Sequence, residues 1–366
     1  MRVLILADAF FASREQALLT RLRVGLADEG VHVVKAIPEG VGPQGEAFAR
    51  CVTYSPRTVG LTRAWAARRL AARIDDWGEE GEIDVVHVFG GSVWSFGMDL
   101  AEELEASISL EVWRAGLVER ARELRGFERV PTMLLAPDPA IERALATGGA
   151  SPGPRLAPWG VYTRNEPRKV LQPGRTSGIM LVGSGHDAAA FEAVLRGLGE
   201  VVRAGAQMLI FCDAVAARRA GAWAMARRYG LMDCLSLIDE LEARRELLLQ
   251  GDLLLLPEAR GEQRTIVLEA FAAGVPVVAA RDPMVSLLAD GSICRIVAQP
   301  DAPAWTAAVG DLIENPAKAM EQAARAHEFV RTRRRASDHV AGVLAAYQWM
   351  TSADAIPFAA PGKSVR

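Results

Sequence analysis

Residues 257–283 read PEARGEQRTIVLEAFAAGVPVVAARDP and directly follow the apolar run LLLL. The continuous apolar character of residues 252–256 predicts a buried strand, and the pattern after the next loop predicts a short helix over about 265–273. Gly274 is suited to end that helix and Pro276 prevents its continuation, so VPVVAA forms the following strand. Strand, loop, helix and strand in this order form the repeating unit of a parallel α/β sheet.

The same alternation extends along the chain in both directions. Apolar runs predict further strands at 2–8, 32–38, 83–89, 107–113, 132–137, 179–185, 206–213 and 234–239. Helical patterns separate them, at 61–77, around 98–105, from 188, near 221–229, near 243–250 and from 317 to about 350. Ser13 with Gln16 predicts a capping box that opens a helix ending near Glu29.

The alternation lapses between Thr147 and Gly178, where glycine and proline are frequent. A chain of 366 residues is long enough for two domains of ordinary size. We therefore predict two Rossmann-like α/β lobes with parallel sheets facing across a cleft, which is the expected ligand site. The predicted division is an N-terminal lobe at 1–162, a linker at 163–178, a second lobe at 179–335, and a C-terminal helix with a frayed tail at 336–366.

Composition narrows the class of protein. Half of the residues are hydrophobic, 24% are charged and the net charge is −3, which indicates a globular chain and predicts no nucleic-acid partner. Neither a membrane-spanning run nor a secretory signal is present, so we expect a cytoplasmic protein, with peripheral membrane contact left open. The four cysteines are widely separated and are expected to be reduced core residues.

The predicted helix over 265–273 carries the first chemical signal. A helix that begins at the carboxyl end of a parallel strand presents unpaired N–H groups, which commonly bind phosphate. Arg264 and Thr265 would add a guanidinium and a hydroxyl to such an anion site, and Glu269 shares their face of the helix. A carboxylate there can accept hydrogen bonds from a ribose diol. Spacing alone equally allows Glu269 to be an exposed residue paired with Arg264 or Arg281.

Several segments together resemble the family 4 glycosyltransferases (glycosyl transferases group 1). That family has Pro-Ser, a Glu, seven residues, Glu-Ala and then Gly-x-Pro-Val-Val. The matching segments are LEAFAAGVPVV (268–278), RVLILAD (2–8), DVVHVFG (84–90), RLAPWGVY (155–162), LVGSG (181–185) and residues 288–316. The resemblance implies the glycosyltransferase-B fold and a nucleotide-sugar donor, a UDP-, GDP- or ADP-sugar, bound as substrate in the cleft.

The resemblance also assigns residues to the donor. Glu269 corresponds to the family glutamate that binds the nucleotide ribose. The loop from Glu262 to Ile266, which includes Thr265, would face the diphosphate and the sugar. Gly183 and Gly185 would let the donor approach the backbone closely, because glycine has no Cβ.

The sequence departs from the family at three places. Gly261 stands where the first glutamate of the pair is expected, and Glu262 is one residue away. The arginine and lysine that usually follow the first strand of the donor lobe are absent, which makes Arg264 the candidate to neutralise the leaving diphosphate. The strand over 107–113 is followed by Arg114, and Trp113-Arg114 stands where the family often has a catalytic-site histidine. His87 is the only histidine near a strand end in this lobe, and it is either catalytic or a buried structural residue.

These observations predict an enzyme that transfers a sugar from a nucleotide sugar to a glycan, lipid or small-molecule acceptor with retention. Glu262, Arg264 and His87 are its catalytic candidates, and no metal or cofactor is expected. The alternative is a catalytically silent homologue that binds a nucleotide sugar or a partner protein. A nicotinamide dehydrogenase is disfavoured, because no complete G-x-G-x-x-G follows a strand.

Overall fold

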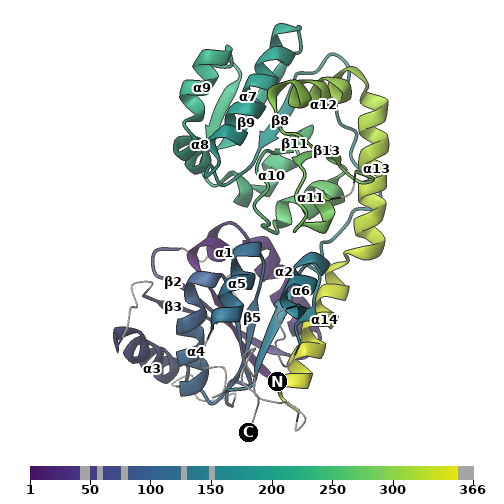
Figure 1. Cartoon of the computed structure of the whole chain (residues 1–366). Coiled ribbons are helices and arrows are strands. Elements are labelled where there is room, and N and C mark those ends of the chain that lie inside the picture. Colours follow the sequence, from purple (N-terminus) through teal and green to yellow (C-terminus); the bar gives the residue numbers. More distant parts are fainter. Residues whose placement is uncertain are drawn as a thin grey trace. The chain divides into compact units, whose positions relative to one another are not determined.

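The structure is a computed structural model that describes residues 1–41, 50–55, 61–75, 81–124, 130–147, 153–289 and 291–352 (Figure 1). It divides into two compact units, each described here by itself. The first unit contains residues 1–159 and the segment from Ala336 onward, and the second unit contains Gly160–Arg335. Trp77, at the predicted end of one helix, and most of the expected frayed tail lie outside the described residues.

Seven described strands form the sheet of the first unit, in the order β3-β2-β1-β4-β5-β6-β7. Every neighbouring pair is parallel. The strands are β1 (Arg2–Ala7), β2 (His32–Pro38), β3 (Cys51–Tyr54), β4 (Val85–Phe89), β5 (Ser107–Glu111), β6 (Thr132–Ala136) and β7 (Arg155–Leu156). The central strands are buried along their whole length, as the continuous apolar runs predict.

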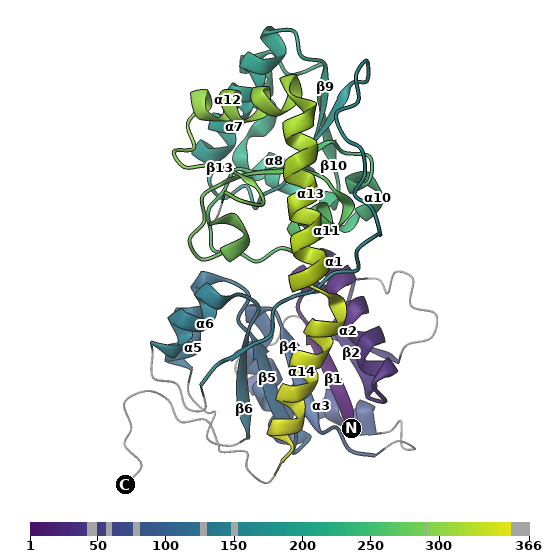
Figure 2. The ribbon, with the colours of Figure 1, turned by 90° about the vertical axis from the view of Figure 1, so that its right-hand side faces the viewer.

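Helices cover both faces of this sheet. They are α1 (Ala9–Ser13), α2 (Gln16–Asp28), α3 (Leu61–Asp75), the 3-10 turn η1 (Gly91–Val93), α4 (Trp94–Glu103), α5 (Ala115–Glu123), α6 (Pro139–Ala146) and α14 (Ala336–Met350). Figure 2 shows α14 lying along the first sheet beside α2. The last long helix of the chain therefore belongs to the core of the first unit.

The predicted capping box at Ser13 and Gln16 is wrong. Ser13 is the last residue of α1, and its hydroxyl donates to the carbonyl of Ala9 at 2.7 Å. The residue that caps is Asp8, whose side chain accepts from the backbone N–H of Phe11. The chain thus enters a short helix immediately after β1, because an aspartate directly at the strand end satisfies the first free N–H.

The second unit contains a six-stranded parallel sheet with the order β10-β9-β8-β11-β12-β13. Its strands are β8 (Ser177–Leu181), β9 (Met208–Asp213), β10 (Leu235–Ile238), β11 (Leu253–Leu256), β12 (Val277–Ala280) and β13 (Arg295–Val297). Its helices are α7 (Ala188–Arg203), α8 (Ala214–Ala220), α9 (Ala222–Tyr229), η2 (Leu241–Ala243), α10 (Arg245–Leu248), α11 (Thr265–Ala273), η3 (Ser286–Leu288), α12 (Ala302–Glu314) and α13 (Pro316–Arg333). The expected α/β class with two parallel sheets is confirmed.

The helix expected after LLLL is confirmed at both ends. Helix α11 runs from Thr265 to Ala273 and ends at Gly274, whose φ of 75° is in the left-handed region that favours glycine. A Cβ on Gly274 would also lie 2.6 Å from the side chain of Pro167. Residues of α11 are buried except Glu269, which is half-buried. The helix is therefore fixed both by its C-terminal glycine and by packing.

In both sheets the order in which successive strands are added reverses at an equivalent point. In the first sheet the strand order turns between β1 and β4, and in the second it turns between β8 and β11. The loops that follow these strands lead to opposite faces of the sheet and leave a crevice at the carboxyl ends of the strands. Ligands of open α/β sheets bind in such crevices, so these loops are where functional side chains are expected.

His87 lies in the interior of the first unit. Its side chain is fully buried in β4, with Nδ1 2.6 Å from the hydroxyl of Tyr347 on α14 and Nε2 3.3 Å from Glu111. The other oxygen of Glu111 accepts from the indole of Trp159 at 2.6 Å. Burial and the charge of Glu111 raise the pKa of Tyr347 well above its ordinary value, so its hydroxyl stays protonated. This arrangement attaches α14 to the sheet.

Substituting Tyr347→Phe removes the hydroxyl that contacts His87 and leaves a buried ring nitrogen without that partner. We expect the free energy of unfolding to fall by about 1–3 kcal/mol, the cost of one buried unsatisfied polar group. Urea unfolding of the full chain measures this change. The exposed Gln348 on the same helix provides the control, and Gln348→Ala should change the free energy by no more than about 0.5 kcal/mol. Equal effects of the two substitutions would contradict a role for this contact.

Candidate functional site

Glu258 lies at the switch point of the second sheet and contacts the loop after β8. Its carboxylate accepts from the backbone N–H groups of Ser184, Gly185 and Asp187, which we call the amide nest, with distances of 3.2 Å from Gly185 and 2.8 Å from Asp187. The hydroxyl of Ser184 adds a fourth bond at 3.0 Å. One carboxylate therefore satisfies the free donors that precede α7.

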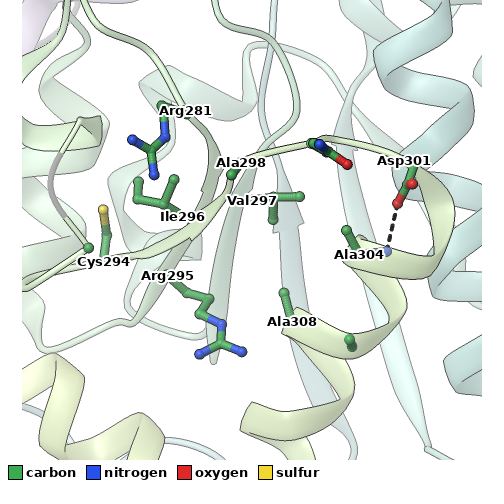
Figure 3. Close-up of a pocket in the computed structure, with 12 residues that line it drawn as sticks. Arg281, Cys294, Arg295, Ile296, Val297, Ala298, Asp301, Ala304 and Ala308 are labelled. Atoms are coloured by element: carbon green, nitrogen blue, oxygen red, sulfur yellow. Dashed lines mark hydrogen bonds between the residues drawn. The ribbon is translucent and has the colours of Figure 1, made fainter.

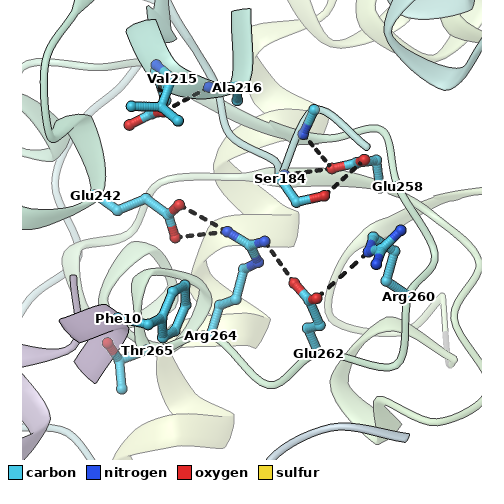
Figure 4. A network of polar contacts seen from close by, with 12 residues as sticks. Phe10, Ser184, Val215, Ala216, Glu242, Glu258, Arg260, Glu262, Arg264 and Thr265 are labelled. Carbon is cyan, nitrogen blue, oxygen red and sulfur yellow. Dashed lines mark hydrogen bonds and ion pairs between the residues drawn. The ribbon is translucent and has the colours of Figure 1, made fainter. Parts of the chain in front are cut away.

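Arg264 is held between two carboxylates at the start of α11. Its Nη1 donates to both oxygens of Glu242, at 2.7 and 2.9 Å, and its Nη2 donates to Glu262 at 2.7 Å. Figure 4 shows the guanidinium lying between the two acidic side chains, with Arg260 on the far side of Glu262. Burial alone lowers the pKa of Arg264, but the charges of Glu242 and Glu262 raise it above the ordinary value. Arg264 is a permanent cation whose charge is already balanced.

A second ion pair lies beside the first turn of α11. Nε of Arg245, on α10, is 2.8 Å from Glu269, and Nη2 of Arg245 donates to the hydroxyl of Thr265 at 2.9 Å. The alternative pairing of Glu269 with Arg264 or Arg281 is therefore replaced by a pairing with Arg245. The Glu269 side chain is 11% exposed, so it is not a solvated surface carboxylate. Thr265 and Ile266 are buried at the start of the helix.

The two glycines assigned to the donor have different surroundings. A Cβ on Gly183 would lie 2.7 Å from an oxygen of Glu258 and 2.9 Å from the ring of Phe191. Gly185 has φ of 73°, and a Cβ there would collide with the backbone of Ala216 on α8. Gly183 thus leaves room for an acidic group beside the loop, whereas Gly185 allows the loop to pack against the neighbouring helix.

The structure brings part of the predicted site together. Glu262, Arg264 and Gly183 line one small pocket at the carboxyl ends of β8 and β11, whose full lining is Val182, Gly183, Leu256, Glu258, Arg260, Glu262, Arg264, Val267, Asp282 and Leu288. Asp282 accepts from the backbone N–H of Gly261 at 2.6 Å and so fixes the loop before α11. His87 belongs to the first unit and is fully buried, so it is not part of this pocket.

Sequence reasoning missed Glu258, Glu242 and Arg245. Each contacts a predicted residue, or the loop that carries one, from a position that is distant in the sequence. Glu258 and Ser184 are 74 residues apart, and Glu242 and Arg264 are 22 residues apart. The position of Glu258, directly after a buried strand, was the one available signal, because that position faces the switch-point crevice.

A larger hollow, of about 600 Å³, lies at the edge of the second sheet beside β13 and α12. Figure 3 shows Arg281 and Arg295 at its border and Asp301 accepting from the backbone N–H of Ala304. Asp301 therefore caps α12. The hollow contains none of the predicted site residues, and its charged groups do not converge on one point.

The first unit has its own acidic residue at its switch point. Asp8 follows β1, is buried, and accepts from the hydroxyl of Ser92 at 2.8 Å, across from the end of β4. A Cβ on Gly90 would collide with this carboxyl. Burial raises the pKa of Asp8 above its ordinary value, and hydrogen bonds from Phe11 and Ser92 lower it by less.

Two further findings concern the whole set of described residues. No group of three or more histidine, cysteine, aspartate or glutamate side chains in the described ranges is arranged to hold a metal ion. Within the same part of the chain, no helix has the length and apolar character needed to span a bilayer. All four cysteines are free thiols.

One family model matches part of the second unit. Residues 169–315 match the model described as Glycosyl transferases group 1. This segment contains the amide nest, Glu258 and the whole of α11. No curated protein matches the chain.

Solved structures match nearly the whole chain. A glycosyltransferase from Rickettsia africae has a TM-score of 0.71 at 11% identity, covering 96% of this chain and 99% of that one. HepE from Anabaena in complex with UDP-glucose has a TM-score of 0.71 at 12% identity, covering 94% and 100%. Sucrose-phosphate synthase from Thermosynechococcus elongatus has a TM-score of 0.69 at 14% identity, covering 95% and 98%. These likenesses establish the glycosyltransferase-B fold.

Substituting Arg264→Met removes the cation that Glu242 and Glu262 share while keeping most of the side-chain volume. We expect the free energy of unfolding to fall by about 3–5 kcal/mol, because Glu242 and Glu262 lose the buried cation that they share. Urea unfolding measures the change. The control is Arg203→Met, which breaks an exposed pair with Glu200 and should cost less than about 1 kcal/mol. A loss below 1 kcal/mol for Arg264→Met would contradict the structural role of this cluster.

Replacing Asp8 with asparagine tests the raised pKa. Because the folded state favours the protonated carboxyl, the wild-type chain is most stable, relative to Asp8→Asn, below the ordinary aspartate pKa. That advantage is lost as the pH rises toward the folded-state pKa, by up to about 1.4 kcal/mol for each unit of difference between the two pKa values. Urea unfolding of both proteins between about pH 4 and 7 measures the trend. A difference that stays constant with pH, or grows as pH rises, would contradict the raised pKa.

Proposed function

We propose that this protein is a glycosyltransferase that takes a sugar from a nucleotide-sugar donor bound to its second unit. The observation that carries the proposal is the pocket at the switch point of the segment that matches the glycosyl transferases group 1 model, where Gly183, Glu262 and Arg264 meet. Similar structures include one in complex with UDP-glucose, which supports a nucleotide sugar as the donor class.

The proposed binding mode assigns each element a task. The half-buried carboxylate of Glu269 accepts hydrogen bonds from the ribose hydroxyls, with Arg245 holding it in position. The diphosphate lies between the start of α11 and the loop after β8, where backbone N–H groups and helix dipoles favour an anion. Glu262, fixed by Arg264, accepts hydrogen bonds from sugar hydroxyls. Arg264 acts through Glu262 and Glu242 as a positioning residue, since its own donors are engaged by these carboxylates.

In the proposed reaction, the bond between the anomeric carbon and the diphosphate oxygen breaks and a bond to the acceptor hydroxyl forms. The acceptor proton passes to the leaving diphosphate, and the sugar keeps its anomeric configuration. The protein mainly stabilises the departing negative charge and holds the two substrates in line. We assign the enzyme to the family 4 type, acting without a metal or cofactor on a glycan, lipid or small-molecule acceptor in the cytoplasm. Its free thiols are consistent with a reducing compartment.

One observation favours the alternative of a catalytically silent binding protein. The cation expected to neutralise the leaving group, Arg264, is bound on both sides by carboxylates, which reduces the positive charge available to a diphosphate. Hydrolysis of a donor sugar by the purified chain separates the two functions. Turnover with any of the UDP-, GDP- or ADP-sugars supports the enzyme, whereas nucleotide binding without turnover on any donor and acceptor supports the silent protein.

Substituting Glu269→Ala tests the ribose contact. Loss of hydrogen bonds to a charged acceptor should weaken binding of the preferred nucleoside diphosphate about 10- to 100-fold, because each such bond is worth about 1.5–3 kcal/mol. Calorimetric titration of wild type and variant measures the affinities. Glu200→Ala, which removes an exposed carboxylate of α7, should leave the affinity unchanged. Unaltered binding by Glu269→Ala would remove this residue from the donor site.

A further inference from the structure

The amide nest has the composition of an anion site and already holds an anion. Three backbone N–H groups, from Ser184, Gly185 and Asp187, converge on the carboxylate of Glu258. The nest lies between a strand and the sixteen-residue helix α7, and at the point where the sheet order reverses. Backbone donors in this position commonly bind phosphate oxygens.

Glu258 occupies the nest from a different part of the chain. It follows β11, whereas the nest follows β8, so the contact joins the two loops on either side of the switch point. Glu258 also lines the small pocket together with Gly183. Gly183 gives the carboxylate access to the nest, because a Cβ there would approach its oxygen to 2.7 Å.

The loop that forms the nest has contacts besides those with Glu258. Arg219 on α8 supports the loop from its other side, donating to the carbonyl of Ser184 at 2.6 Å, so the loop does not depend on Glu258 alone. Asp187 caps α7 by accepting from Ala190, which holds the helix start independently. These contacts do not involve the Glu258 carboxylate.

A phosphate and Glu258 cannot use the nest at the same time. Each N–H group offers one strong hydrogen bond, and two anions at hydrogen-bonding distance from the same donors repel each other. The pocket is also lined by the carboxylates of Glu262 and Asp282 and by Arg260 and Arg264, so Glu258 is the third carboxylate beside two cations and leaves the lining net negative.

We infer that Glu258 is an internal occupant of the phosphate-binding amides and that a nucleotide diphosphate must displace it to bind. The inference rests on the proposed function and adds an autoinhibitory contact to that site. Glu258 sets the affinity for the diphosphate without touching the nucleoside. The open state, with Glu258 withdrawn, is a minor population, and the observed dissociation constant is raised in proportion to its rarity.

The test is calorimetric titration of the full chain with UDP, GDP and ADP, in wild type and in Glu258→Gln. The amide of glutamine keeps the shape of the side chain but removes the charge that holds it in the nest. We expect the preferred nucleoside diphosphate to bind about tenfold more tightly to the variant, which corresponds to an open population on the order of 10% in wild type. Glu258→Ala should show the same direction.

Two controls isolate the effect. Glu200→Gln makes the same change in net charge on α7, far along the helix from the nest, and should leave affinity unchanged. The nucleoside without phosphates should bind wild type and Glu258→Gln equally, because it does not reach the nest.

The outcomes distinguish the inference from the function on which it rests. Tighter diphosphate binding by Glu258→Gln and Glu258→Ala, with no change for the nucleoside, supports the internal occupant. If wild type binds a diphosphate and both variants bind it with equal or lower affinity, the inference is overturned and the proposed function stands. If the variants also bind the nucleoside without phosphates more tightly, the inference is overturned, because the substitution would then have changed the pocket as a whole and not the nest alone. Failure of all these proteins to bind any of the three diphosphates overturns the proposed function and the inference together.

Discussion

Backbone N–H groups at the carboxyl ends of a parallel sheet have no partner within the sheet, and the fold must supply one. In the second unit Glu258 supplies it, by accepting from three amides of the loop after β8. In the first unit Asp8 lies on the other side of the switch point, after β1, and accepts from the hydroxyl of Ser92 in the loop after β4. An acidic side chain therefore closes each switch-point crevice, where ligands of such sheets usually bind. In our proposal, stability and ligand binding therefore depend on the same donors.

Ion pairs between arginines and glutamates organise the residues around the start of α11. Arg264 is paired with Glu242 and Glu262, and Arg245 is paired with Glu269. A buried ion pair of this kind contributes less to stability than its geometry suggests, because both ions lose hydration, but removing one partner is costly. These residues are consequently both structural and candidate functional groups, and measurements of folding and of ligand binding are needed to separate the two roles.

The fold alone leaves the chemistry open. Solved glycosyltransferase structures share this architecture at 11–14% identity, and a glycosyltransferase-B scaffold accommodates different loops at the same strand ends. Glu258 and Arg264 bring charged side chains to the pocket where we propose that a nucleotide sugar brings its own negative charge.

The sequence by itself determined the α/β alternation, the limits of α11 and its termination at Gly274, because periodicity and glycine conformation act over a few neighbouring residues. It did not predict β3, β7, β13, α6 or α12. It also indicated that Glu262, Arg264 and Glu269 lie near one another, since they share one loop and one helix. Only the tertiary structure decided that His87 is enclosed by Tyr347 and Glu111, that Arg245 pairs with Glu269, and that Glu258 fills the amide nest. These contacts join residues that are 24 to 260 positions apart, and which distant side chains meet is set by the packing of whole strands and helices, not by local preference.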